Sequence, residues 1–270
     1  DQGPGMPTSA VLLVLASAVL HACWNTLLHR SSDPPTAIVV SYLGSGLVLL
    51  PALVLDPPTE VLGWAVLSAL AHAFYVSMLG SAYREGSLSV AYPIARGTAP
   101  LLIGLGGWMF LSETPSTATT MGLVVLTGGL LLLGGLANHL RERRAVVFAA
   151  ATGLATVGYS LIDARSVDQT GTLGYMAVLM LLGGSLALAA RRPALSRLRS
   201  VAREGILIGL GQGGAYALVL VAFQRAQAGQ VAGLRQVSVV IGTLVAREAL
   251  GPRAFWGAVA VAVGAVLVIW

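Results

Sequence analysis

Two arginines lie inside long apolar runs of this chain, Arg96 about eight residues into one run and Arg235 about six into another. An ionisable side chain in hydrocarbon is costly and must face protein or a water-filled cavity. A guanidinium stays protonated and offers a forked set of donors, which suits a carboxylate, phosphate or phosphonate. The pattern predicts that both arginines approach one central cavity and neutralise an anionic group. The alternative is a structural ion pair of either arginine with Asp163.

A second polar group lies in the first apolar run, where His21, Trp24 and Asn25 have i, i+3 and i+4 spacing and therefore share one helical face. His21 could titrate, since its unperturbed pKa is about 6.5, and this would allow proton coupling. The alternative is a fixed hydrogen-bond partner. Asn25 could bridge helices, and we expect Trp24 to form a cavity wall.

Other side chains with hydrogen-bonding capacity lie at or near the middle of apolar runs. Pro93 removes a backbone amide shortly before Arg96, which predicts a gating bend there. The remaining members of the predicted binding site are His72, Tyr75, Tyr92, Asp163, Gln212, Tyr216 and Gln236. Tyr159 is a further neutral hydrogen-bonding group. No catalytic group, metal site or cofactor is expected.

The composition defines the class of protein that must position these groups. Of the 270 residues, 56% are hydrophobic and only 10% are charged, against about 25% charged in ordinary soluble domains. The charges lie in short clusters between apolar runs of roughly 17–25 residues, the length that spans a bilayer. The sequence predicts an all-α, multi-pass membrane protein. Its sixteen arginines lie mostly in the connections, which indicates anchoring of helix ends and not nucleic-acid binding.

Proline, glycine and arginine clusters divide the chain into about ten predicted spans. The spans are residues 10–28, 36–55, 61–82, 88–111, 118–137, 145–164, 172–190, 205–223, 229–246 and 254–270. The basic connection at 191–204 could form a short interfacial helix. Residues 1–5, before Met6, are typical of a remnant of tag cleavage, and we expect Met6 to be the native start.

Arginine distribution predicts the orientation. Connections after odd-numbered spans carry twelve arginines and those after even-numbered spans only Arg165 and Arg225. The positive-inside rule then places the odd connections in the cytoplasm and both termini outside. The expected location is a bacterial-type cytoplasmic, or inner, membrane.

An internal repeat links the two halves. Glu113 is followed by Gly122 and Gly129, and Glu248 by Gly257 and Gly264, with the same spacings. This pattern predicts a first repeat at 6–137, a linker at 138–144 and a second repeat at 145–270. Five spans per repeat would insert the second copy in the opposite sense, which gives inverted halves that can exchange conformations. Each glutamate is expected to accept from amides that open the next helix.

The chain resembles the ten-helix branch of the drug/metabolite transporter superfamily, with two EamA-type repeats. The resemblance covers residues 8–270 and rests on Leu111–Thr114 with the glycines after it, on Arg247–Leu250 with its own glycines, and on His21–Asn25. It implies a secondary transporter that works by alternating access, with export the commoner direction. It also implies a central cavity lined chiefly by the first, third, fourth, sixth, eighth and ninth helices.

The resulting hypothesis is transport of a small organic metabolite, an amino acid or organic anion, by a monomer or dimer. Two rivals share the fold: an exporter of cationic drugs, and a flippase of a lipid-linked precursor. A membrane-embedded enzyme is disfavoured because no zinc-protease motif, phosphate loop or acid–base carboxylate pair is present. Cys23 and His21 are two positions apart and would point to different faces of a helix.

Overall fold

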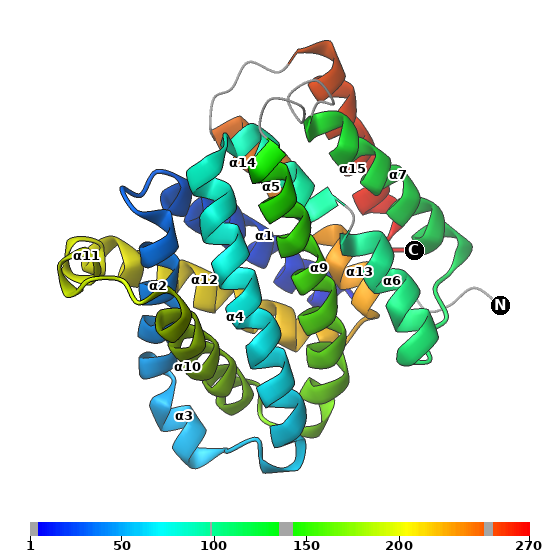
Figure 1. The fold of residues 1–270 in the computed structure, drawn as a ribbon. Coiled ribbons are helices and arrows are strands. Elements are labelled where there is room, and N and C mark those ends of the chain that lie inside the picture. The colour runs from blue at the N-terminus through cyan, green and yellow to red at the C-terminus, as the bar shows by residue number, and fades with distance from the viewer. Residues whose placement is uncertain (1–4, 98, 135–142, 246–250) are drawn as a thin grey trace.

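The protein is a bundle of α-helices, seen in a computed structural model of the chain (Figure 1). The structure describes residues 5–97, 99–134, 143–245 and 251–270, with only the backbone at 88–90, 92, 93, 134 and 243–245. Its helices are α1 (Thr8–His29), α2 (Pro34–Val48), α3 (Leu50–Leu55), η1 (Thr59–Val61), α4 (Leu62–Glu85), α5 (Leu88–Gly97), α6 (Ala99–Phe110), α7 (Thr117–Gly134), α9 (Arg143–Ser166), η2 (Val167–Gln169), α10 (Thr172–Arg191), α11 (Leu195–Ser200), α12 (Ala202–Phe223), α13 (Ala228–Leu234), α14 (Val237–Val245) and α15 (Pro252–Leu267). The described ranges contain no β-strand.

Five helical segments are long and apolar enough to cross a bilayer: α1, α4 with η1, α9 with η2, α10 and α12. Shorter apolar helices are formed by α2, α7 and α15. Large apolar side chains such as Leu12, Leu154 and Leu210 are more than half exposed on the outside of the bundle. Water would disfavour so much exposed apolar surface, whereas lipid tails would not. The protein is therefore a membrane-embedded helical bundle, and the count of ten spans stays a prediction.

Each predicted span coincides with one helix or with two consecutive helices, although residues 135–137 and 246 lie outside the described ranges. The span predicted at 36–55 consists of α2 and α3, and that at 88–111 of α5 and α6 on either side of residue 98. The span predicted at 229–246 consists of α13 and α14. The backbone of α5 is helical through Pro93. The gating bend expected there stays a prediction.

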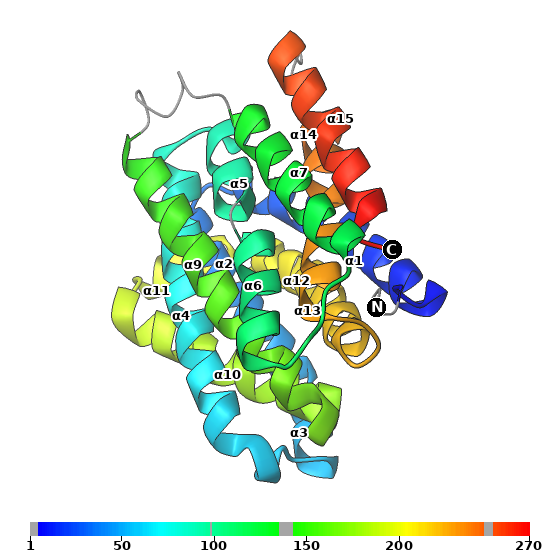
Figure 2. The same ribbon diagram turned by 90° about the vertical axis from the view of Figure 1, so that its right-hand side faces the viewer.

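The repeated glycines bring α7 and α15 together, and Figure 2 shows these helices side by side. A Cβ atom on Gly122 would lie 2.8 Å from the carbonyl oxygen of Gly264, and one on Gly129 would lie 2.7 Å from that of Gly257. In the reverse direction, a Cβ atom on Gly264 would lie 2.7 Å from the carbonyl oxygen of Gly122, and one on Gly257 would lie 2.8 Å from that of Gly129. The first glycine of each repeat therefore packs on the second glycine of the other. Glu248 lies outside the described residues.

The other helix contacts follow a similar reciprocal pattern. If α1, α2, α4 and α7 are matched with α9, α10, α12 and α15, the α4–α9 contact corresponds to α12–α1 and the α4–α10 contact to α12–α2. The α2–α10 contact corresponds to itself. Met6 donates its amide to the carbonyl of Ile269 at 2.7 Å, so both ends of the described chain lie together. The centre of the bundle lies among α1, α4, α9 and α12 (Figure 1).

A side-chain amide interrupts the helix between α13 and α14. In a continuous helix the amide of Gln236 would donate to the carbonyl of Ala232. Here the side-chain nitrogen of Gln236 donates to that carbonyl at 2.7 Å, and its backbone amide donates to Gly233 at 3.0 Å. The amide of Ser238 likewise donates three residues back, to Arg235. The backbone thus tightens at Arg235 and Gln236, which leaves Arg235 at the end of α13.

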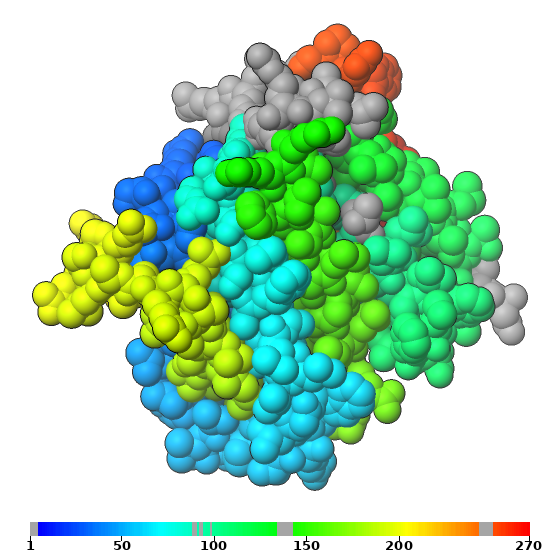
Figure 3. Space-filling model, in the orientation of Figure 1, coloured from blue at the N-terminus to red at the C-terminus, as the bar shows by residue number. Residues whose placement is uncertain are grey.

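The basic connection at 191–204 contains the short helix α11, as predicted. It extends from the body of the protein, in yellow at the left of Figure 3. Arg197 at 3.7 Å from Asp33 links it to the start of α2.

Candidate functional site

A small cavity of about 20 Å³ lies at the centre of the bundle. This volume holds about one water molecule. Its lining comes from α1, α2, α4, α9, α10, α12 and the end of α13. The lining residues are His21, Trp24, Tyr42, His72, Tyr75, Tyr159, Met180, Gln212, Tyr216 and Arg235. Seven of the twelve predicted binding residues are therefore brought together at one place.

The two arginines occupy matching places in their segments. Arg96 is in the last turn of α5, and Arg235 caps the end of α13. A cation at a helix C-terminus is favoured by the helix dipole. The side chains are 5% and 4% exposed, and the two guanidiniums are close enough to interact electrostatically. Arg235 lines the cavity directly, whereas Arg96 does not.

Neither arginine has a carboxylate partner within the described part of the chain. Among these residues, Nε of Arg235 and one terminal nitrogen of Arg96 are buried without a hydrogen-bond acceptor. A buried guanidinium is normally paired or fully hydrogen-bonded, because its desolvation is costly. The centre of the bundle therefore has an excess of positive charge and free donors. The structure shows no ion pair of Asp163 with either arginine.

Gln236 connects α5 with the interruption between α13 and α14. Its side-chain oxygen accepts from Nε of Arg96 at 3.2 Å, while its nitrogen replaces the missing backbone bond to Ala232. This predicted site residue is 3% exposed and does not line the cavity. Its position ties α5 to the α13–α14 break and orients the guanidinium of Arg96.

Aromatic rings form most of the cavity wall. His72 stacks on Tyr159 with 4.1 Å between ring centroids and meets Tyr216 edge-on at 5.3 Å. Tyr75 also meets Tyr159 edge-on, at 5.5 Å. Nδ1 of His72 lies 2.9 Å from the carbonyl of Ser68. Donation to that carbonyl leaves Nε2 as the acceptor on the opposite side of the ring.

Asp163 lies next to this wall and is completely buried. Three hydroxyl groups from three helices donate to its carboxylate: Ser68 at 2.5 Å, Tyr175 at 2.6 Å, and Tyr216. Asp163 does not itself line the cavity. It holds Tyr216, which does, in a fixed orientation.

The residues on the polar face of α1 have two kinds of contact, with the cavity and with α4. His21 and Trp24 line the cavity and meet edge-on at 4.8 Å. Asn25 instead donates to the carbonyl of His21 and accepts from the hydroxyl of Tyr83 at 2.6 Å. Asn25 therefore bridges α1 and α4, which is the structural alternative considered for it. Cys23 is exposed on another face, away from the buried His21.

Gln212 lines the cavity from α12 and accepts from Ser41 at 2.6 Å. The side chains of Tyr92 and Pro93 lie outside the described residues. Sequence reasoning missed Tyr42 and Met180, which bring α2 and α10 into the cavity wall. No sequence signal could have selected them, because tyrosine and methionine in apolar runs are common packing residues.

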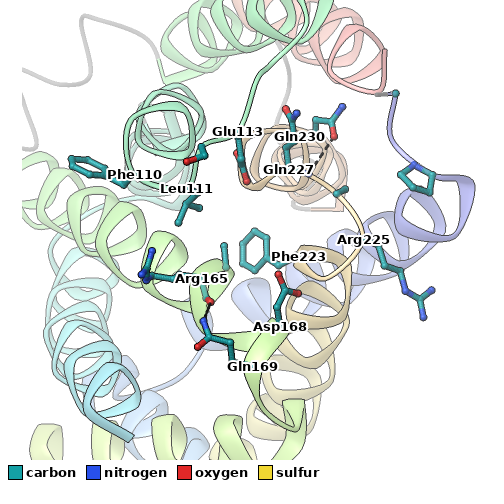
Figure 4. Close-up of a pocket in the computed structure, with 15 residues that line it drawn as sticks. Phe110, Leu111, Glu113, Arg165, Asp168, Gln169, Phe223, Arg225, Gln227 and Gln230 are labelled. Carbon is teal, nitrogen blue, oxygen red and sulfur yellow. Dashed lines mark hydrogen bonds between the residues drawn. The ribbon is translucent and has the colours of Figure 1, made fainter. Parts of the chain in front are cut away.

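A larger open cavity of about 590 Å³ lies toward the connections after α6, α9 and α12. It is two helical turns from the central cavity along α12, since Phe223 lines the first and Tyr216 the second. Figure 4 shows the ring of Phe223 near its middle, with Arg165 and Asp168 nearby and Arg225 extending away. We call this cavity the vestibule.

Glu113 lines the vestibule and joins the two halves of the chain. It accepts from the amide of Ala228 at 2.7 Å, at the start of α13. The predicted contact with a helix-opening amide thus exists, but to a helix of the other half and not to the following helix. Burial raises the pKa of the Glu113 carboxyl, while the amides of Ala228 and Gly229 act in the opposite direction.

Comparison with known proteins gives a distant relative and solved structures of similar fold. No protein-family model matches the chain. The "uncharacterized transporter YwfM" of Bacillus subtilis (strain 168) is 25% identical over 183 residues, which cover 65% of this chain and 62% of that relative. The alignment therefore spans less than two thirds of the relative's length. A protein crystal structure matches 96% of this chain and 96% of its own, with a TM-score of 0.73 at 18% identity. This likeness concerns the fold alone.

Proposed function

We propose that the protein is a membrane transporter of the drug/metabolite type, which binds a small organic anion or zwitterion in the central cavity. Arg235 would neutralise the acidic group of the substrate directly, and Arg96 would add to the positive potential. The observation that carries the proposal is the pair of buried guanidiniums at matching helix ends with no described carboxylate opposite them. The name of the Bacillus subtilis relative supports transport in general.

The remaining cavity residues would shape the pocket around that anion. His21, Trp24, His72, Tyr75, Gln212 and Tyr216 offer rings and neutral hydrogen-bonding groups. A cationic substrate would be repelled by the guanidinium of Arg235, and no described carboxylate lines the cavity to offset that charge. The charge of the site therefore favours an organic acid or amino acid over a cationic drug.

Alternating access is the mechanism that the reciprocal packing supports best. Contacts that correspond when the two halves are exchanged would let each half adopt the conformation of the other. The central cavity of about 20 Å³ is too small for an organic molecule, so binding requires the bundle to open. The vestibule provides the path on the side of the connections after α6, α9 and α12. By the positive-inside rule this side faces outward, and we expect export through it.

A thermal-shift screen of the purified protein against organic acids, amino acids, phosphonates and cationic drugs tests the proposal. A ligand at about 100 times its Kd stabilises the native state by about 2.7 kcal/mol. We expect stabilisation by acids or zwitterions that is lost in Arg235→Gln. The matched control is Arg225→Gln, since Arg225 is exposed. Stabilisation by cations alone, equal in both variants, would contradict the proposal.

A further inference from the structure

We propose that Asp163 is a proton-binding site, connected to the central cavity through the hydroxyl group of Tyr216. The proton site itself stands on the geometry around Asp163. Its coupling to an anionic substrate rests on the proposed function.

The first argument is the cost of placing an acid at this position. The Asp163 side chain is completely buried, and within the described residues it has no arginine partner. A carboxylate in a membrane bundle without a cation is expensive, and acids that remain in such places commonly take part in proton movement. Asparagine has the same shape: its carbonyl oxygen could accept from Ser68 and Tyr175, and its amide nitrogen could donate to the hydroxyl of Tyr216. A purely structural role therefore gives no reason for the charge.

The second argument is the chemistry of the partners. All three donors to Asp163 are hydroxyl groups, from Ser68, Tyr175 and Tyr216. A hydroxyl can donate or accept, unlike an amide N–H or a guanidinium. The ionised carboxylate accepts three hydrogen bonds. After protonation it donates one, and a hydroxyl turns to accept it, so the cluster satisfies both states without moving a helix.

The third argument is the connection to the cavity. Tyr216 lines the cavity and donates to Asp163, so a hydronium ion in the cavity can pass a proton to the tyrosine oxygen while the tyrosine proton passes to the carboxylate. The net change is that the hydronium ion becomes water and Asp163 becomes a carboxylic acid. Ser68 makes a second link, because its hydroxyl contacts both Asp163 and, at 3.3 Å, Nδ1 of His72.

Several titratable or charged groups face this cluster from the surrounding helices. They are Tyr42 on α2, His72 on α4, Tyr159 on α9, Tyr175 on α10 and Tyr216 on α12, and His21 on α1 and Arg235 at the end of α13 also line the cavity. An anion bound in the cavity would repel the ionised carboxylate across Tyr216, and this favours protonation of Asp163. Proton and anion would therefore bind together. The proton gradient favours inward movement of the bound proton and would therefore oppose export of the two together. Export would then have to be driven by the concentration gradient of the substrate.

Infrared difference spectroscopy of the purified protein tests the proton site without any substrate. Titration from about pH 9 to about pH 5 should produce the C=O stretching band of a protonated carboxylic acid. We expect this band to be absent in Asp163→Asn. Tyr216→Phe removes one donor to the ionised form, so the band should appear about one to two pH units higher. The matched control is Tyr83→Phe, whose hydroxyl donates to Asn25 instead.

Two results would overturn the proposal. A spectrum with no band that depends on Asp163 between these pH values would show that the carboxylate stays ionised as a structural acceptor. A band at the same pH in Tyr216→Phe and Tyr83→Phe would show that Tyr216 does not connect it to the cavity. If Asp163→Asn does not fold, Ser68→Ala removes another donor and must shift the same band. These results are independent of whether the thermal-shift screen finds an anion.

Discussion

Two adjacent glycines of α7 offer a direct test of the packing that joins the halves. A Cβ atom on Gly129 would lie 2.7 Å from the carbonyl oxygen of Gly257 and 2.8 Å from the amide nitrogen of Val261. Both neighbours are backbone, so α7 and α15 must separate to admit a methyl group. Gly128 is exposed, and a Cβ atom there would meet nothing within 4 Å. Gly129→Ala and Gly128→Ala therefore differ in packing alone.

Overpacking of this kind costs about 1–3 kcal/mol. Alanine in place of glycine within a helix gains about 1 kcal/mol. We expect Gly128→Ala to be neutral or slightly stabilising, and Gly129→Ala to be less stable than Gly128→Ala by about 1–3 kcal/mol, since the helix gain is common to both. The assay is thermal unfolding of the purified variants in one detergent. Equal melting temperatures for the two variants would refute the close contact between α7 and α15.

Two further predictions concern residues that connect the halves. Gln236→Leu should destabilise the protein by about 1–3 kcal/mol, because Nε of Arg96 and the carbonyl of Ala232 both lose their partner. The control is Gln169→Leu, in which an exposed glutamine loses a similar hydrogen bond to a carbonyl four residues earlier. If both variants lower the melting temperature by the same amount, the argument is contradicted. Glu113→Gln should gain stability relative to the wild type as pH rises. The buried Glu113 carboxyl has a raised pKa, so the folded state holds its proton more tightly, and the stability that this contributes at low pH is lost as pH rises through the folded-state pKa. Thermal unfolding of both proteins from about pH 4 to about pH 8 checks this. If the stability of Glu113→Gln minus that of the wild type falls with rising pH, the predicted direction is wrong.

The sequence predicted the parts of this site that differ from their surroundings in composition. Arg96, Asp163 and Arg235 stand out because a charge in an apolar run needs an explanation, and His21 with Trp24 because their spacing places them on one face. The glycine repeat could be predicted as a packing pattern because its spacing matches two helix turns in both halves. The structure adds that each glycine meets the other repeat's glycine.

The parts that sequence could not supply depend on tertiary contacts. Nothing at Arg235 and Gln236 resembles a helix breaker, since the interruption depends on a glutamine side chain that replaces a backbone donor. The donors to Asp163 come from three helices far apart in the chain. Glu113 reaches α13 of the other half because the connection after α6 folds back, with Ser112 in the left-handed region at a φ of 56°.

The central claim is that an organic anion binds at the buried arginines, and the position of a bound anion tests it most directly. We would determine a crystal structure with 4-bromobenzoate and locate the bromine from its anomalous signal. The account predicts a peak in the central cavity beside Tyr159 and Tyr216, with the carboxylate on Arg235, in a bundle opened on one side. A peak confined to the vestibule beside Asp168, or one that remains unchanged in Arg235→Gln, would contradict it.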